Sequence, residues 1–294
     1  MKIGFRASDS AALLLCTLRR SVAPPKGGGG IAVDELVKFM SDKAELKVFI
    51  HIPKTSGSTV CAALRRKFDK SEQISWYGRE KFRSGLPALA KEITSDTNFV
   101  AGHFAYGIDA FVSRTVEYFT ILRHPVDRVI SSYEFTRRRD LATTDMPEVV
   151  GDAKRFDIMT FMEKYPQQYN TQTHMLCGGA LNLELARENL QNCFFGVQDF
   201  TDAYTVLALK KMGFQPRIPK AKNINIHKKK YNDDVIAAIR AHCEMDLALY
   251  EFAYRHFLQL LESRYPVLLK LGKPPTLMDR VRVAAGGVAE RFRR

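Results

Sequence analysis

Short apolar runs alternate along this chain with longer segments in which apolar residues recur every three or four positions. The apolar runs are rich in β-branched and aromatic residues, which predicts buried strands at 48–52, 98–103, 118–123 and 193–197. Helical spacing predicts helices at 31–46, 60–64, 86–93, 126–137, 156–165, 171–177, 204–212 and 233–261. This alternation indicates an α/β fold, with a central, mostly parallel sheet flanked by helices.

Glycine and proline divide the chain into three parts. Pro24, Pro25 and the run Gly27 to Gly30 form a linker by composition, so residues 1–30 are expected to be an N-terminal arm with its linker. Residues 31–270 hold the predicted strands and helices and form one domain of ordinary size. Residues 271–294 form a basic tail.

The charge balance favours anionic partners. The chain has 45 Lys and Arg against 32 Asp and Glu, a net charge of +13, which suits nucleotides, acidic glycans, nucleic acid or a membrane surface. The apolar stretch 11–16 is too short to span a membrane, so we expect no transmembrane segment. A soluble, cytoplasmic protein is therefore favoured, with the Golgi lumen as the alternative.

Cysteine does not indicate a metal site. The five cysteines include no C-x-x-C pair, so neither a zinc site nor a disulfide framework is expected, although one or two bridges are compatible with the pattern. No metal is predicted.

The stretch Lys54-Thr55-Ser56-Gly57-Ser58-Thr59 lies between a predicted strand and a predicted helix. Unpaired amides at a helix N-terminus and a loop of small residues form a cradle for an anion, and Lys54 adds a formal charge. Ser58 or Thr59 is expected to cap the helix or bind a phosphate oxygen. Lys54 precedes Gly57, whereas a Walker A lysine follows its last glycine. The loop is thus P-loop-like without being that of an ordinary ATP or GTP hydrolase; the alternative is an ordinary turn with a solvated lysine.

Three predicted strands end on polar residues. The first leads to Lys54, the second ends at His103 and the third at Arg123. Ligands bind at the carboxyl ends of the strands of a parallel sheet, so these residues are expected to meet in one crevice. Ser131 lies about two helical turns beyond Arg123, so both can face one phosphate. An arginine that caps the sheet edge and a buried serine are the structural alternative.

Taken in order, these stretches resemble sulfotransferases that use 3′-phosphoadenosine-5′-phosphosulfate (PAPS). Residues 52–59 resemble the 5′-phosphosulfate loop, and residues 123–131 resemble the 3′-phosphate segment. Residues 101–107 are similar to the Gly-His segment of the heparan sulfate 2-O- and 6-O-sulfotransferase group. Residues 170–176, 195–197 and 223–225 are also similar to this group.

The resemblance implies transfer of a sulfuryl group from PAPS to an acceptor hydroxyl, with an acidic or neutral glycan as the expected acceptor. Lys54 would neutralise the leaving 5′-phosphate, which the amides of residues 55–59 would hold. Arg123 and Ser131 would bind the 3′-phosphate, and His103 would take the acceptor proton. The catalytic residues are thus His103 and Lys54, and the donor-binding residues are Lys54, Thr55, Ser56, Gly57, Ser58, Thr59, Arg123 and Ser131.

The chain departs from the family pattern in the loop. Ser56 replaces a glycine, a change that is tolerated if Ser56 need not adopt a positive φ. His124 replaces an acid that often precedes the proline, with little expected effect on phosphate contact. The loops 140–152 and 213–227 are expected to choose the acceptor. The basic runs 137–139 and 228–230 are either solvated faces or the holders of an acidic acceptor.

Two other function classes compete with this interpretation. A P-loop-like nucleotide kinase requires a Walker A lysine and a strand-end aspartate for Mg²⁺, and neither is found in the sequence. A polyanion-binding protein without catalysis requires basic residues interleaved with exposed aromatics, whereas the aromatics here lie mostly in apolar runs. No specific nucleic acid partner is therefore expected. The pattern does not indicate an oligomeric state.

Overall fold

The structure, a computed structural model, describes residues 45–216, 218 and 231–272, all of which belong to one compact unit. Several predicted features lie outside the described residues: the N-terminal arm and linker, residues 31–44 of the first predicted helix, the segment 223–225, the basic run 228–230, and the tail from 273 onward.

The core of this unit is a five-stranded sheet in the order β2-β3-β1-β4-β5, with every neighbouring pair parallel. The strands are β1 Leu46–Ile50, β2 Gln73–Trp76, β3 Phe99–Gly102, β4 Val116–Leu122 and β5 Cys193–Val197. Because β1 is the middle strand, the residues that follow it lie between those that follow β3 and β4.

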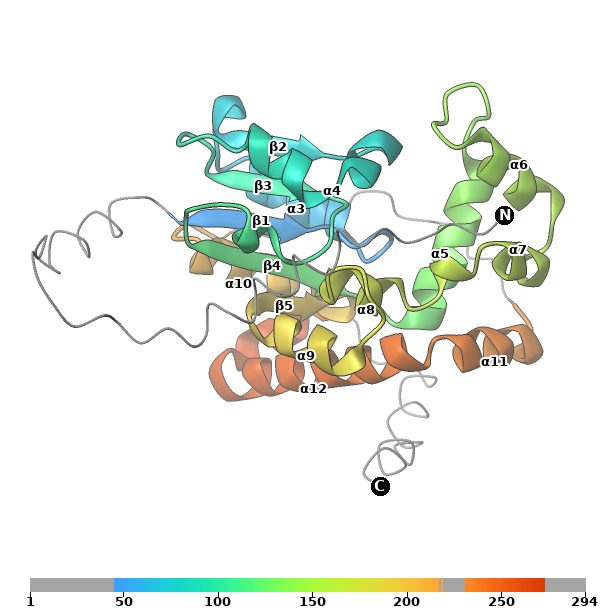
Figure 1. The fold of residues 1–294 in the computed structure, drawn as a ribbon. Coiled ribbons are helices and arrows are strands. Elements are labelled where there is room, and N and C mark those ends of the chain that lie inside the picture. The colour runs from blue at the N-terminus through green and yellow to red at the C-terminus, as the bar shows by residue number, and fades with distance from the viewer. Residues whose placement is uncertain (1–44, 217, 219–230, 273–294) are drawn as a thin grey trace, which may run out of the picture. The chain divides into compact units, whose positions relative to one another are not determined.

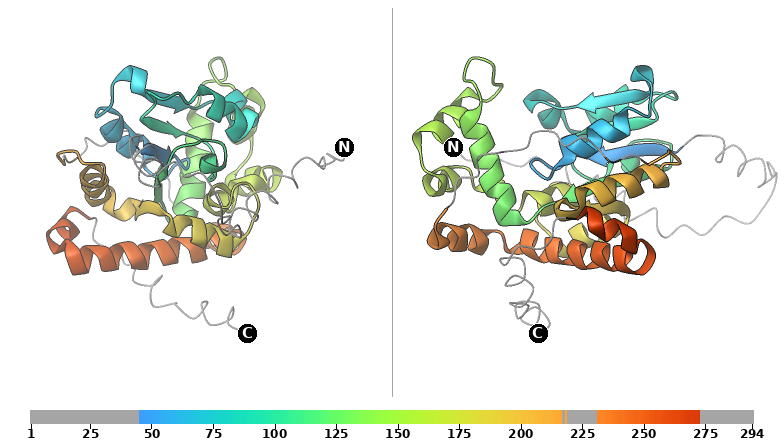
Figure 2. Two further views of the ribbon diagram at one scale, coloured as in Figure 1. Left: turned by 60° about the vertical axis from the view of Figure 1, so that its left-hand side comes forward. Right: turned by 180° about the vertical axis from the view of Figure 1, so that it is seen from behind.

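Helices flank the sheet, as Figures 1 and 2 show. The α-helices are α3 Gly57–Arg65, α4 Arg79–Glu92, α5 Pro125–Arg138, α6 Pro147–Arg155, α7 Ile158–Lys164, α8 Thr171–Leu176, α9 Leu183–Gln191, α10 Thr201–Lys211, α11 Asp233–His242 and α12 Glu244–Arg264. Short 3₁₀ turns lie at Lys70–Glu72, Ile108–Ala110, Pro166–Gln168, Gln198–Phe200 and Pro266–Leu271. The predicted α/β fold is therefore confirmed, with a sheet that is parallel throughout.

Two apolar clusters hold the elements in place. The larger cluster joins the sheet to α3, α8, α9, α10 and α12, and includes fully buried Phe49, Phe99 and Phe119. The smaller cluster joins α5, α6, α7 and α11, which gather beside the sheet beyond the end of β4 (Figure 1). The segment that carries Arg123 is thus fixed on one side by the sheet and on the other by this group of helices.

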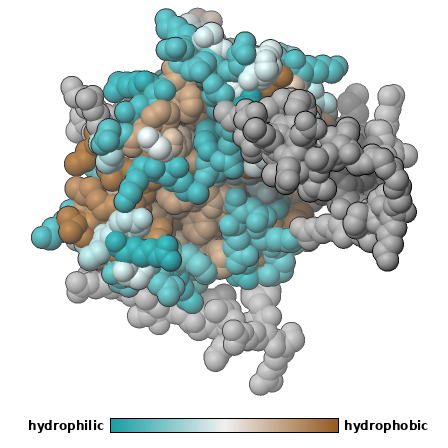
Figure 3. Space-filling model, turned by 90° about the vertical axis from the view of Figure 1, so that its left-hand side faces the viewer, coloured by the Kyte–Doolittle hydropathy of each residue, from teal (hydrophilic) through white to brown (hydrophobic). Residues whose placement is uncertain are grey.

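The surface is of mixed polarity. Seen from the end at which the strands begin, polar residues surround patches of apolar ones (Figure 3). No helix within the described ranges has the length and apolar character needed to cross a membrane.

The structure corrects three predicted segments. Leu46 belongs to β1 and not to the end of a helix. Residues 76–83, which lie between predicted elements and are expected to form a polar, aromatic loop, contain the end of β2 and the start of α4. The predicted loop at 140–152 contains the first part of α6. β2 was missed because it is a short, polar edge strand of which only Trp76 is buried, so it has no apolar run to reveal it.

Candidate functional site

The predicted site residues follow three neighbouring strands at the same edge of the sheet. The loop that carries Lys54 follows β1, His103 follows β3, and Arg123 follows β4. Arg123 makes direct contact with this loop, because its Nη1 donates a hydrogen bond to the carbonyl of Lys54 at 3.1 Å. The ring of His103 packs against His51 in the same loop, with 4.9 Å between ring centroids.

The loop has an unusual backbone. Lys54 (φ 70°) and Ser56 (φ 73°) both lie in the left-handed region, which non-glycine residues adopt at a cost of about 1–2 kcal/mol each. The sequence predicted that serine could replace the family's glycine here if Ser56 need not adopt a positive φ. Ser56 does adopt a positive φ, so the replacement carries strain. Ser56 is also the N-cap of α3 and makes no side-chain cap bond, so the expected capping by Ser58 or Thr59 is wrong.

Free amide donors line the loop. Among the described residues, the backbone N–H groups of residues 55–58 find no hydrogen-bond acceptor, whereas that of Thr59 donates to Ser56 at 3.0 Å. The hydroxyl of Thr55 is buried and donates to the carbonyl of Ile52 at 2.8 Å, so it stabilises the turn. Thr55 is thus placed to contribute its amide to an anion, and Thr59 is not.

Residue 57 must be glycine because a side chain there would clash with the His51 ring, and not because of its backbone angles. A Cβ at this position would lie 2.2 Å from Cδ2 of His51, far inside van der Waals contact. The absence of a side chain at Gly57 therefore lets the His51 ring lie against the start of α3. This close packing links the loop to the histidine at the end of β3.

Lys54 has an environment that disfavours its charge. Its ammonium lies 3.8 Å from the centroid of the Phe135 ring, and no carboxylate of the described residues pairs with it. Burial, followed by the positive charges of Arg123 and Arg138, lowers the pKa of Lys54 to about 8. A bound anion would reverse these effects, since opposite charge favours the protonated amine.

Arg123 is a half-buried cation with unused hydrogen-bonding capacity. Its Nε is buried and has no hydrogen-bond partner among the described residues, and burial lowers the pKa of the guanidinium. Ser131 lies on α5 beyond Arg123 and is half-buried. The structure brings Arg123 to the loop but records no bond that ties the Ser131 hydroxyl to either, within the described residues.

His103 lies in a small aromatic cluster. Its ring packs edge-on against both His51 and Tyr77, and the Tyr77 hydroxyl is hydrogen-bonded to Nδ1 of His51 at 3.0 Å. Burial lowers the pKa of His103 to about 4. Burial, with the nearby charges of His103 and Lys54, lowers the pKa of His51 to about 3. Both rings are therefore neutral at pH 7, the form in which histidine accepts a proton.

Replacing Ser56 with glycine is expected to stabilise the protein. Glycine adopts a φ of 73° without strain, so Ser56→Gly should raise the free energy of unfolding by about 1 kcal/mol, or the melting temperature by about 2–4 °C. Ser58→Gly is the matched control, because Ser58 is in the first turn of α3 and glycine there should destabilise by about 0.5–1 kcal/mol. Thermal denaturation of both variants checks the prediction, and a destabilised Ser56→Gly would contradict it.

The two histidines should make stability fall in acid. Unfolded histidine binds a proton near pH 6.5, whereas His51 and His103 resist protonation until about pH 3 and 4. Between those values the unfolded state binds more protons, so stability falls as the pH decreases, by up to about 2 kcal/mol per histidine from pH 7 to pH 5. Urea denaturation at both pH values should show a smaller drop in His51→Gln than in wild type. An equal drop in His51→Gln would refute the assignment.

Sequence reasoning missed several neighbours of the predicted residues. Phe135, which is 45% exposed, covers the Lys54 ammonium, and Tyr77 contacts both histidines. Gln172 binds the backbone of Arg123. The position of Phe135, four residues after Ser131 on a predicted helix, offered one signal. For Gln172 the signal was the resemblance of residues 170–176 to the sulfotransferase group, which did not reveal its contact with Arg123.

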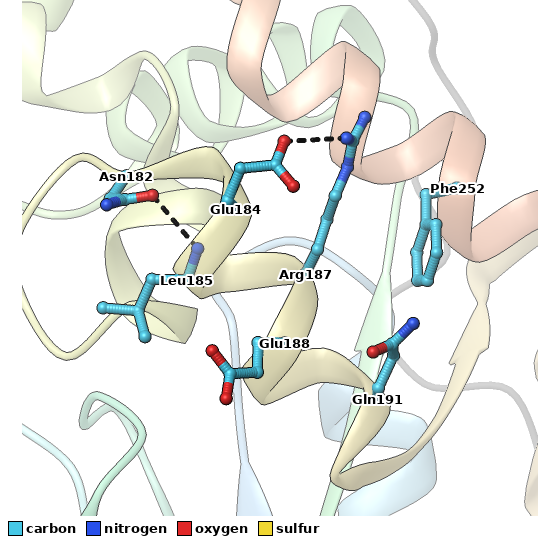
Figure 4. Close-up of a pocket in the computed structure, with 7 residues that line it drawn as sticks. All are labelled: Asn182, Glu184, Leu185, Arg187, Glu188, Gln191 and Phe252. Atoms are coloured by element: carbon cyan, nitrogen blue, oxygen red, sulfur yellow. Dashed lines mark hydrogen bonds and ion pairs between the residues drawn. The ribbon is translucent and has the colours of Figure 1, made fainter.

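A separate surface hollow lies over α9, shown in Figure 4. Six of its lining residues belong to the segment 182–191, and Phe252 belongs to α12. Arg187 contacts both Glu184, at 3.0 Å, and the ring of Phe252. None of the predicted site residues lines this hollow.

Comparison with known proteins leaves the family of this chain open. No family model matches its sequence, and no curated protein matches it either.

Proposed function

We propose that this protein is a sulfotransferase that moves a sulfuryl group from PAPS to an acceptor hydroxyl of a carbohydrate. The observation that carries the proposal is the juxtaposition at the ends of β3, β1 and β4. A loop with free amides, a half-buried arginine bonded to that loop and a neutral histidine lie together there. The order of the sequence segments, with its resemblance to PAPS sulfotransferases, supports the same reading.

The residues present fit a donor with two phosphate groups. Four loop amides, the Nε of Arg123 and the Lys54 ammonium are donors without acceptors among the described residues. A buried donor without a partner, as the Nε of Arg123 is among the described residues, destabilises a protein because it loses its hydration without compensation. An anion at the N-terminus of α3 would pair with the loop amides and the Lys54 ammonium, and a second anion would pair with the Nε of Arg123.

The proposed chemistry assigns one task to each residue. When bound, the donor supplies the sulfuryl group and a 5′-phosphate leaving group. A ring nitrogen of His103 takes the proton of the acceptor hydroxyl, whose oxygen forms a bond to sulfur as the bond from sulfur to the bridging oxygen breaks. Lys54 and the loop amides stabilise the negative charge that grows on the leaving phosphate. Arg123 holds the 3′-phosphate and so orients the nucleotide.

The basic run 137–139 is divided by the fold. Arg139 forms an ion pair with Asp145 at 3.0 Å, which ties it to the loop before α6. Arg138 is exposed and lies close enough to Lys54 for its charge to lower the pKa of Lys54. This arrangement supports an acidic acceptor beside Lys54, with Arg138 as the residue of the run that meets it.

Calorimetric titration with adenosine 3′,5′-bisphosphate, beside AMP and ATP, tests the proposal. We expect the bisphosphate to bind at least ten times more tightly than either of the others, because only it offers phosphates to both the loop and Arg123. Preference for ATP in the presence of Mg²⁺ would favour the kinase alternative. Equal, weak and strongly salt-dependent binding of all three would favour a polyanion-binding protein.

A further inference from the structure

The segment Asn170–Thr173 links the site to the long helix α12. The side chain of Gln172 is fully buried and binds both backbone groups of one residue, Arg123. Its Oε1 accepts from the Arg123 N–H at 2.9 Å, and its Nε2 donates to the Arg123 carbonyl at 2.9 Å. A buried amide with both bonds satisfied has one orientation and holds its partner in one place.

Arg123 depends on this contact because it lies beyond the sheet. The last paired residue of β4 is Leu122, and α5 begins at Pro125, so Arg123 lies in the short connection between them and its backbone takes no part in the strand ladder or the helix. Gln172 takes the place of a strand neighbour at this position. The guanidinium can then reach the carbonyl of Lys54, a residue held at a positive φ.

Asp246 on α12 anchors Gln172 in turn. Its buried carboxylate accepts from the N–H groups of Gln172 (3.2 Å) and Thr173 (2.7 Å) and from the Thr173 hydroxyl (2.8 Å). Asn170 closes the junction, since its side chain accepts from the Asp246 N–H and donates to the carbonyl of His242, each at 3.0 Å. Buried Arg128 lies 4.0 Å from the same carboxylate.

We propose that Gln172, anchored by Asp246, is a positioning residue that sets Arg123 against the Lys54 loop and so determines selectivity for nucleotides with a 3′-phosphate. This inference rests on the proposed function, because it assigns the 3′-phosphate to Arg123. Gln172 itself touches neither the loop nor the nucleotide.

The test compares two nearly isosteric amide-to-apolar variants, one at Gln172 on α8 and one at Asn189 on α9. Gln172→Met removes both bonds to Arg123, whereas Asn189→Leu removes a 2.8 Å bond to Leu176 at the other end of α8. Calorimetry with adenosine 3′,5′-bisphosphate and with AMP should show that Gln172→Met loses at least tenfold in affinity for the bisphosphate and less than threefold for AMP. Asn189→Leu should change neither by more than twofold. Equal losses for both nucleotides in Gln172→Met would overturn the inference.

A double variant tests whether Gln172 acts through Arg123. In an Arg123→Ala background, Gln172→Met should weaken bisphosphate binding by less than twofold, because the side chain that it positions is gone. If the two substitutions each reduce bisphosphate affinity by the same factor in the double variant as they do singly, the inference is wrong. If Gln172→Met does not fold, Gln172→Asn, which keeps the amide but shortens its reach by one methylene, is expected to show the same loss of selectivity.

A readout without nucleotide separates the two proposals. Failure of the wild-type protein to bind the bisphosphate would refute the proposed function alone. Hydrogen exchange then tests the positioning role: the hydrogen-bonded amides of Ile52 and Thr59 in the loop should exchange at least ten times faster in Gln172→Met than in wild type or Asn189→Leu. Unchanged exchange in this loop would overturn it.

Discussion

His103→Ala is expected to lower turnover by at least about 100-fold while the affinity for adenosine 3′,5′-bisphosphate changes by less than threefold. A general base contributes about 10²–10⁴-fold to a rate, and His103 is neutral at pH 7 because burial lowers its pKa to about 4. The side chain follows β3, whereas the phosphate-binding groups follow β1 and β4. Catalysis should therefore be lost without loss of nucleotide binding.

The measurement is release of adenosine 3′,5′-bisphosphate from PAPS in the presence of a panel of glycan and simple alcohol acceptors. His256→Ala is the matched control, since this histidine is exposed on α12 and bonds only to its own helix among the described residues. The wild-type rate should also stay nearly constant from pH 5 to pH 7, because the base remains deprotonated down to about pH 4. An unimpaired His103→Ala, or a rate that falls with an apparent pKa near 6.5, would remove His103 from the role of base.

Arg123→Ala is expected to weaken bisphosphate binding by about 100-fold. A hydrogen bond between charged groups contributes roughly 1.5–3 kcal/mol, and each 1.4 kcal/mol is tenfold in affinity. Arg123 also donates to the carbonyl of Lys54, so its loss should loosen the loop that receives the 5′-phosphate. AMP binding should consequently weaken as well, by about threefold to tenfold.

Calorimetry on Arg123→Ala and Arg187→Ala checks this prediction. Arg187 is a suitable control because it is paired with Glu184 on α9 and contributes nothing to the strand-end loops. Full retention of bisphosphate affinity in Arg123→Ala would show that Arg123 caps the sheet edge and nothing more, which is the structural alternative that the sequence left open.

Local sequence determined the scaffold. Four of the five strands are predictable, because a strand that is buried on both faces must be apolar along its length, as Phe49 and Phe119 are. The order strand, loop and helix around Lys54 and Gly57 follows from the same local rules. The same local rules did not predict the edge strand β2, because it is a strand through its pairing with β3 and not through its composition.

Tertiary structure decided how the loop is held. The depressed pKa of Lys54 arises from burial and from the charges of Arg123 and Arg138, which are distant in the sequence. The positive φ of Ser56 and the close contact between Gly57 and the His51 ring involve residues near in the sequence, but they are seen only in the folded loop. Gln172 is the clearest case, since it binds Arg123 from 49 residues away.

By itself, then, the sequence determined the α/β class, most strand positions and the residue types that a phosphate loop requires, because these depend on periodicity and on neighbours along the chain. Only the tertiary structure decided which polar groups are satisfied and which are left as free donors at the strand ends. The reason is that hydrogen-bond satisfaction and desolvation depend on distances in space, which the order of residues does not specify.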